Sequence, residues 1–122
     1  MFIKEIKDYY KAGAEADIIV SDDELEILCY AQPFSGKYNV DFVLCPLDYS
    51  DILTASKNEY LVEKLNTGFY DYFLRGKLLD VEKGLVQVGG ITLQGLRYMP
   101  KDIRQGEYIE FSVARIDLIE LK

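Results

Sequence analysis

Aromatic and basic side chains gather in the second half of the chain, between positions 69 and 104. Aromatic rings can stack on the bases of a single nucleic-acid strand while lysine and arginine hold its phosphates. Tyrosine and arginine are also enriched at the energetic centres of protein–protein interfaces. The candidate binding residues are therefore the tyrosines and cations of this region: Tyr70, Tyr72, Arg75, Lys77, Arg97, Tyr98, Lys101 and Arg104.

Strand alternation limits this candidate surface. Side chains of an extended strand alternate between two faces, so Phe69, Phe73 and Arg75 fall on one side. Tyr70 and Tyr72 fall on the other side. One of these sets must face the core, so at most half of the aromatic residues can form a binding surface. Core packing with the hydroxyl group near water is the competing interpretation for the tyrosines.

Other reactive side chains form no recognisable catalytic or metal-binding pattern. The chain has no histidine, which excludes Ser-His and Cys-His pairs within it. The carboxylates at 22–26 lack the alternating ligands and central glycine of a calcium loop and are interpreted as an exposed turn. Cys29 and Cys45 are interpreted as buried, reduced thiols, because two sulfurs do not complete a zinc site. We therefore expect a protein without a metal or cofactor that is not an enzyme.

Charge is distributed unevenly along the chain. The 122 residues carry a net charge of −7, and 49% of them are hydrophobic. Residues 1–68 have 6 basic and 13 acidic side chains, whereas residues 69–104 have 6 basic and 4 acidic ones. The overall charge disfavours general attraction to nucleic acid or to an anionic membrane. Neither a signal peptide nor an apolar run long enough to span a bilayer is recognisable, so a cytoplasmic location is expected.

The hydrophobic pattern predicts a single, mainly β domain with two helices. Apolar residues recur at helical spacing in residues 2–11. Ser50 can cap a second helix that begins at Asp51 and ends before Gly68, because its oxygen can accept a free backbone N–H. Strands are expected at 16–20, 24–31, 38–45, 69–80, 85–93 and 108–121, with Pro46 ending the third of them.

The glycines at 76, 84 and 89–90, together with the segment 100–108 before the last strand, resemble the OB-fold. That resemblance implies a small antiparallel Greek-key barrel of about six strands, with an N-terminal helix and a helix between the third and fourth strands. It covers about a third of the chain and concerns the fold alone. The hydrogenase-maturation chaperones are one family with such a barrel. Their Met-Cys start is missing here, since Phe2 follows Met1, so no metal or thiol role is carried over.

Three binding functions remain open from the sequence. The first is a non-enzymatic protein–protein interaction module, because the chain lacks catalytic patterns and carries tyrosine and arginine that could be exposed. The second is binding of single-stranded nucleic acid through the aromatic and basic region 69–104. The third is an acidic inhibitor that mimics a polyanion through residues 1–68. An enzyme with an unrecognised site would need two carboxylates with perturbed pKa values in a deep pocket.

Overall fold

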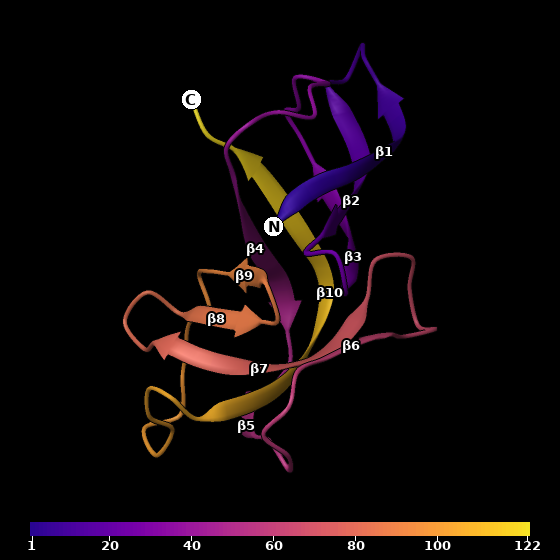
Figure 1. The fold of residues 1–122 in the computed structure, drawn as a ribbon. Helices are drawn as coiled ribbons and strands as arrows, with labels where there is room; N and C mark the ends of the chain where they lie inside the picture. Colours follow the sequence, from indigo (N-terminus) through magenta and orange to yellow (C-terminus); the bar gives the residue numbers. More distant parts are fainter.

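The computed structural model describes residues 1–122 and consists of strands joined by turns and loops, without any helix (Figure 1). The strands are β1 (Phe2–Tyr10), β2 (Glu15–Ser21), β3 (Glu26–Ala31), β4 (Phe42–Tyr49), β5 (Leu53–Thr54), β6 (Leu61–Lys64), β7 (Tyr72–Asp80), β8 (Leu85–Val88), β9 (Ile91–Leu93) and β10 (Tyr108–Glu120). It therefore contains no helix that is long and apolar enough to span a membrane.

The long strand β10 organises the sheet, because its two halves have different neighbours. Its first half pairs with β7 and β5, and its second half pairs with β4 and, through one parallel bridge, with β3. Strands β1 and β2 extend the sheet beyond β3, and β8 and β9 extend it beyond β7. The sheet is curled so that the end of β9 lies beside β4. A hydrogen bond from the Gln94 N–H to the Leu44 carbonyl joins the two segments. The result is a barrel-like, all-β fold around one cluster of 24 buried hydrophobic residues.

The predicted N-terminal helix is wrong, because residues 2–10 form the edge strand β1. Two register shifts, at Lys4 and at Lys7, interrupt its pairing with β2. Each shift leaves one residue without a partner, as in a β-bulge. Ile3 and Ile6 therefore both lie opposite inward-facing residues of β2 although they are three positions apart. The bulges increase the spacing between inward-facing residues of β1 from two positions to three. A spacing of three positions also occurs on one face of a helix.

The second predicted helix is also wrong, because residues 51–65 contain the short strands β5 and β6. Ser50 does not cap a helix. Its N–H donates to the Ser112 carbonyl, and its hydroxyl oxygen accepts the Ser112 N–H. These bonds fix the chain beside β10 just before β5. Of the apolar residues that suggested a helical face, Ile52 is buried whereas Leu53 is exposed.

The expected barrel of about six strands is corrected to a curled sheet of ten strands. Gly89 and Gly90 form a two-residue hairpin turn between β8 and β9 and not a bend within one strand. Pro46 lies inside β4, opposite Ile116, and does not end it. The Leu44 carbonyl points away from β10, towards Gln94. Backbone groups two residues apart in a strand point to the same side, so the nitrogen of Pro46 also points away from β10. The missing N–H of proline therefore costs no hydrogen bond between β4 and β10.

Candidate functional site

The structure distributes the predicted binding residues over separate places. Tyr72 is 7% exposed, and its hydroxyl oxygen accepts the Leu28 N–H at 2.9 Å. It therefore connects β7 to β3 and offers no ring face at the surface. Lys77 is half-buried on β7, where it forms no ion pair.

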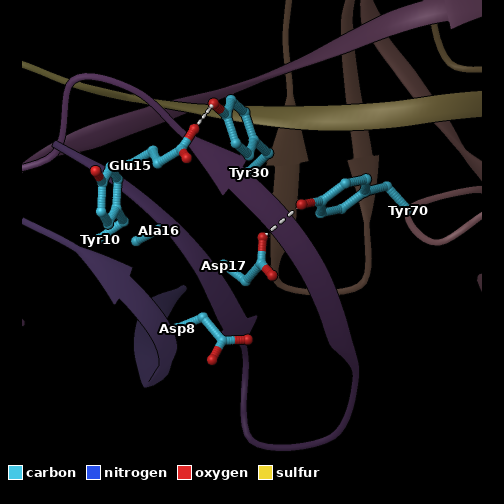
Figure 2. Close-up of a pocket in the computed structure, with 7 residues that line it drawn as sticks. All are labelled: Asp8, Tyr10, Glu15, Ala16, Asp17, Tyr30 and Tyr70. Atoms are coloured by element: carbon cyan, nitrogen blue, oxygen red, sulfur yellow. Dashed lines mark hydrogen bonds between the residues drawn. The ribbon is translucent and has the colours of Figure 1, made fainter. Parts of the chain in front are cut away.

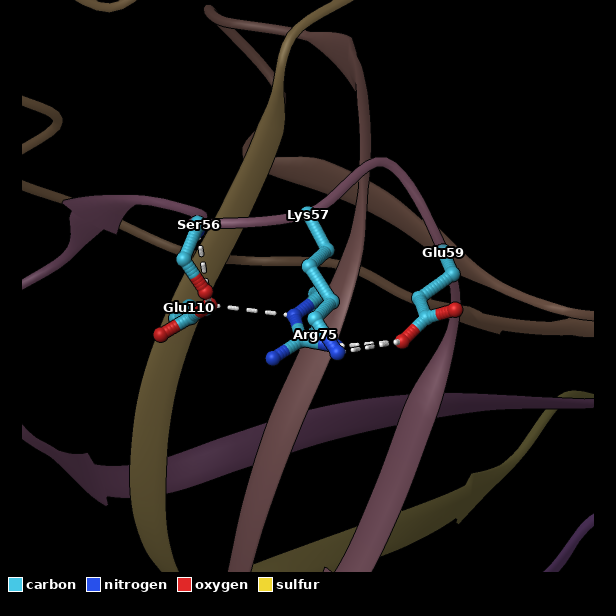
Figure 3. Close-up of polar contacts among 5 residues, drawn as sticks. All are labelled: Ser56, Lys57, Glu59, Arg75 and Glu110. Carbon is cyan, nitrogen blue, oxygen red and sulfur yellow. Dashed lines mark hydrogen bonds and ion pairs between the residues drawn. The ribbon is translucent and has the colours of Figure 1, made fainter.

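Arg75 lies between two carboxylates on the outer side of β7 (Figure 3). Its Nε donates to Glu110 Oε1 at 3.0 Å, and its Nη1 lies 3.4 Å from Glu59 Oε1. The Arg75 side chain is 11% exposed and that of Glu110 is 18% exposed. The Ser56 N–H and the Arg75 guanidinium hold the pKa of Glu110 below its ordinary value. The charge of Arg75 is thus neutralised within the fold.

Four of the predicted residues lie on one exposed segment, residues 94–107 between β9 and β10, which we call the Tyr98 loop. They are Arg97, Tyr98, Lys101 and Arg104. None of the three cations forms an ion pair. The Tyr49 hydroxyl donates to the Arg97 carbonyl at 2.9 Å and also accepts the Arg97 N–H. Both backbone groups of Arg97 are therefore held by one side chain.

Tyr70 lies on a different part of the molecule, the loop 65–71 between β6 and β7. Its hydroxyl donates to Asp17 Oδ1 at 2.6 Å, and its ring meets Tyr30 edge to face at a centroid distance of 5.9 Å. Together with β1, β2 and β3, Tyr70 borders an open surface cavity of about 230 Å³. We call this cavity the acid–tyrosine pocket; Figure 2 shows its lining residues, Asp8, Tyr10, Glu15, Ala16, Asp17, Tyr30 and Tyr70.

Strand register brings the carboxylates of this pocket together. Asp8 of β1 lies directly opposite Asp17 of β2, and Asp17 lies opposite Tyr30 of β3. Glu15 is two residues before Asp17 and therefore shares its face of the sheet. Like charges directly opposite each other on neighbouring strands destabilise a sheet. No cation of the chain forms an ion pair with Asp8, Glu15 or Asp17.

The tyrosine hydroxyls of the pocket act as donors. Tyr30 donates to Glu15 Oε2 at 2.6 Å, and this bond raises the pKa of Tyr30. Burial and the bond to Asp17 raise the pKa of Tyr70 well above its ordinary value. Both phenols are therefore neutral at physiological pH, and the formal charge of the pocket comes from its three carboxylates.

A cation of the chain, Arg115, already makes a cation–π contact with one of these tyrosine rings. The guanidinium of Arg115 lies 4.5 Å from the centre of the Tyr30 ring while it pairs with Asp117 at 2.6 Å. A cation over an aromatic face is attracted by the electron-rich ring. The chemistry of the pocket, carboxylates beside tyrosine rings, therefore suits a further ammonium or guanidinium group.

Sequence reasoning found Tyr70 but missed the rest of the pocket. The predicted helix over residues 2–11 removed Asp8 and Tyr10 from any strand. Asp17 and Tyr30 occupy outward-facing positions of β2 and β3, two strands that the sequence predicted correctly. The alternation of these strands could therefore have indicated both residues as exposed candidates. The cysteines offer no further site: Cys29 is buried, Cys45 is half-buried, and both are free thiols. No group of three or more cysteine or acidic side chains is arranged to hold a metal ion.

Asp71 fixes the loop that carries Tyr70. Asp71 is 6% exposed. Its carboxylate accepts hydrogen bonds from Lys64 Nζ at 2.7 Å, from the Thr67 N–H at 3.1 Å and from the Thr67 hydroxyl. The bonds from Lys64 and Thr67 lower the pKa of Asp71 to about 2. Lys64 also donates to the Gly68 carbonyl at 2.9 Å. The conformation of loop 65–71 therefore depends on an ionised Asp71.

We expect Asp71→Asn to lower the urea midpoint of unfolding at pH 7. The carboxyl pKa is about 2 in the folded chain and about 3.9 when unfolded. Ionised Asp71 therefore stabilises the fold above about pH 4, and this contribution is lost as the pH falls through about 2. Urea titrations from pH 7 to pH 2 should show the variant and the wild type converging. Asp41→Asn, which removes an exposed carboxylate without side-chain hydrogen bonds, is the control. A difference that stays constant with pH would contradict this role.

Comparison with known proteins found no match to this chain. No protein-family model matches the chain. No curated protein and no solved structure matches it either. The pocket and the Tyr98 loop must therefore be interpreted from their own chemistry.

Proposed function

We propose that the protein is a non-enzymatic protein-interaction module whose acid–tyrosine pocket receives one cationic side chain, lysine or arginine, of a partner. The observation that carries this proposal is the facing pair Asp8 and Asp17. Neither carboxylate forms an ion pair within the chain, although Lys7 and Lys64 line the adjoining cavity. Repulsion between the two carboxylates lowers the stability of the free protein. A bound cation that lies between them removes this repulsion.

The size of the pocket supports a single side chain as its occupant. Its volume is about 230 Å³, below the range of about 300 to 1,000 Å³ that is typical of small-molecule and cofactor sites. The rings of Tyr30 and Tyr70 offer contact to the aliphatic stem and the charged end of such a side chain. The net charge of −7 additionally favours encounter with a cationic partner.

The two alternatives have less support. Nucleic-acid binding through residues 69–104 loses the paired Arg75 and the buried Tyr72. It keeps Lys77, Lys83 and the three cations of the Tyr98 loop. A polyanion mimic rests on the charge count of residues 1–68 alone, and the pocket holds only three of the thirteen carboxylates in that segment. The resemblance to the OB-fold contributes nothing to this proposal, because fold alone does not define function.

We expect a blocked hexapeptide with a central Arg-Tyr pair to bind the pocket weakly, with a Kd of about 1 mM or below. The side chain of Asp8 forms no hydrogen bond, so Asp8→Asn removes charge and leaves the shape of the pocket unchanged. The variant should bind the peptide about fivefold more weakly because one carboxylate is lost. It should also be more stable by about 0.5 kcal/mol, since the like-charge pair is gone. NMR titration and urea unfolding measure the two effects.

Two controls make this experiment decisive. Asp23→Asn causes the same change in net charge on the exposed β2–β3 turn and should leave peptide affinity unchanged. A peptide with glutamine in place of arginine should not bind. Equal binding of both peptides, or equal effects of Asp8→Asn and Asp23→Asn, would overturn the proposal.

A further inference from the structure

We propose that the partner is a second copy of this chain, with Arg97 of the Tyr98 loop of one molecule entering the acid–tyrosine pocket of the other. This inference rests on the proposed function, because it names the source of the cationic side chain. It joins two surface features whose charged side chains form no ion pair within the molecule, the loop and the pocket.

The backbone of the Tyr98 loop is held at Arg97 and strained at Tyr98. Tyr98 is 91% exposed, an unusual state for a large aromatic residue. Its φ of 59° lies in the left-handed region, which is strained for a residue with a side chain. The Tyr49 hydroxyl holds both backbone groups of the preceding residue, Arg97. Strain at an exposed aromatic residue, maintained by a dedicated hydrogen-bonding side chain, is typical of a binding element.

Charge on the loop complements charge in the pocket. Arg97, Lys101 and Arg104 form no ion pair in their own molecule, and the three carboxylates of the pocket form none either. Asp102 and Glu107 also lie on the loop, which leaves it a net charge of +1. Arg97 has the fork-shaped group that can meet two carboxylates at once, and Asp8 and Asp17 form such a pair. The exposed rings of Tyr10 and Phe69 border the pocket region and give Tyr98 an aromatic surface to pack against.

The two features lie too far apart to meet within one molecule. In Figure 1 the loop between β9 and β10 lies at the lower left, whereas β1 and β2 lie at the upper right. Two copies placed side by side in antiparallel orientation can therefore make the loop–pocket contact twice. A two-fold axis relates such contacts, and two-fold dimers are the commonest symmetric assemblies. We accordingly expect a dimer.

Salt affects this contact in two opposing ways. Each copy carries a net charge of −7. At low salt concentration this charge is poorly screened, and the two copies repel each other over long distances. At about 0.15 M salt the screening length is about 8 Å, which weakens the overall repulsion more than a direct ion pair. Dimerisation should therefore be measured at that concentration.

Charge reversal with rescue tests the proposal. Sedimentation equilibrium at about 1 to 200 μM should show a wild-type dimer. Arg97→Glu and Asp8→Lys alone should each weaken dimerisation at least about tenfold, because like charges then meet in both contacts. An equimolar mixture of the two variants should dimerise again, since it forms one native and one exchanged pair. Lys83→Glu, on the turn beside the loop, has the same charge change as Arg97→Glu and should have no effect.

The outcomes separate this inference from the proposed function. A wild-type chain that stays monomeric but binds the Arg-Tyr peptide would overturn the second copy as partner and leave the pocket's function in place. A dimer that survives both reversals, or a mixture without rescue, would overturn the loop–pocket contact. If neither dimerisation nor peptide binding occurs, both proposals fail.

Discussion

Gly84→Ala is expected to destabilise the fold by about 3 kcal/mol, because a Cβ at Gly84 would meet its neighbours more closely than at any other glycine of the chain. Gly84 ends the β7–β8 turn with a φ of 60°, and a Cβ there would lie 2.0 Å from the Leu96 carbonyl oxygen. The left-handed backbone accounts for about 1 kcal/mol of the cost. The clash accounts for the rest, because backbone atoms cannot rotate away as side chains do. Thermal unfolding should show a Tm lower by about 10 °C.

The same substitution should also release the Tyr98 loop. Leu96 N–H donates to the Gly84 carbonyl at 3.2 Å, and Gly95 N–H donates to the Lys83 carbonyl at 3.1 Å. These bonds fasten the start of the loop to the turn. Faster amide hydrogen exchange at Gly95 and Leu96 would report the release, because exchange measures local opening.

Gly106→Ala is the matched control for the clash. Gly106 also has a positive φ, 90°, but a Cβ there would have nothing within 4 Å. Its replacement should therefore cost only the backbone strain, about 1 kcal/mol. Equal losses of stability for the two variants would mean that the close approach of Leu96 to Gly84 does not constrain the fold.

The parts of the fold that the sequence predicts are those with uninterrupted strand periodicity. β2 and β3 alternate regularly between buried and outward residues, and β10 does so over most of its length. β1 lacks this regularity because its two bulges change the spacing of Ile3 and Ile6. A single sequence holds no signal that separates a doubly bulged edge strand from a short amphipathic helix, since both place apolar residues three positions apart.

The candidate site was harder to predict, because strand pairing creates it. Asp8 and Asp17 become neighbours only once β1 pairs with β2 in the observed register. Among the predicted residues, exposure separates those that could bind from those that stabilise the fold. Tyr98 is exposed and Tyr72 is buried, although both are tyrosines in the same aromatic and basic region. Composition and alternation alone could not make that distinction.

Arg75 is the clearest example of a predicted binding residue with a structural role, and Arg75→Ala should destabilise the fold by about 2 to 3 kcal/mol. Removal of the guanidinium leaves Glu110, 18% exposed, without its cation. The lost bonds and the uncompensated carboxylate both lower the free energy of unfolding. Urea unfolding at pH 7 measures the loss. Lys77→Ala, two positions along on the same face of β7 and without an ion pair, should cost little.

A double-mutant cycle with Glu110→Gln identifies the cause of that loss. The amide oxygen introduced by Glu110→Gln can still accept the Ser56 N–H, so this substitution alone should cost less than Arg75→Ala. With the carboxylate already replaced by a neutral amide, loss of Arg75 no longer leaves a charge uncompensated. The double variant should therefore be about 1 kcal/mol more stable than the sum of the single effects predicts. If the effects are additive and Arg75→Ala costs no more than Lys77→Ala, Arg75 is a free surface cation, and nucleic-acid binding through β7 regains its principal residue.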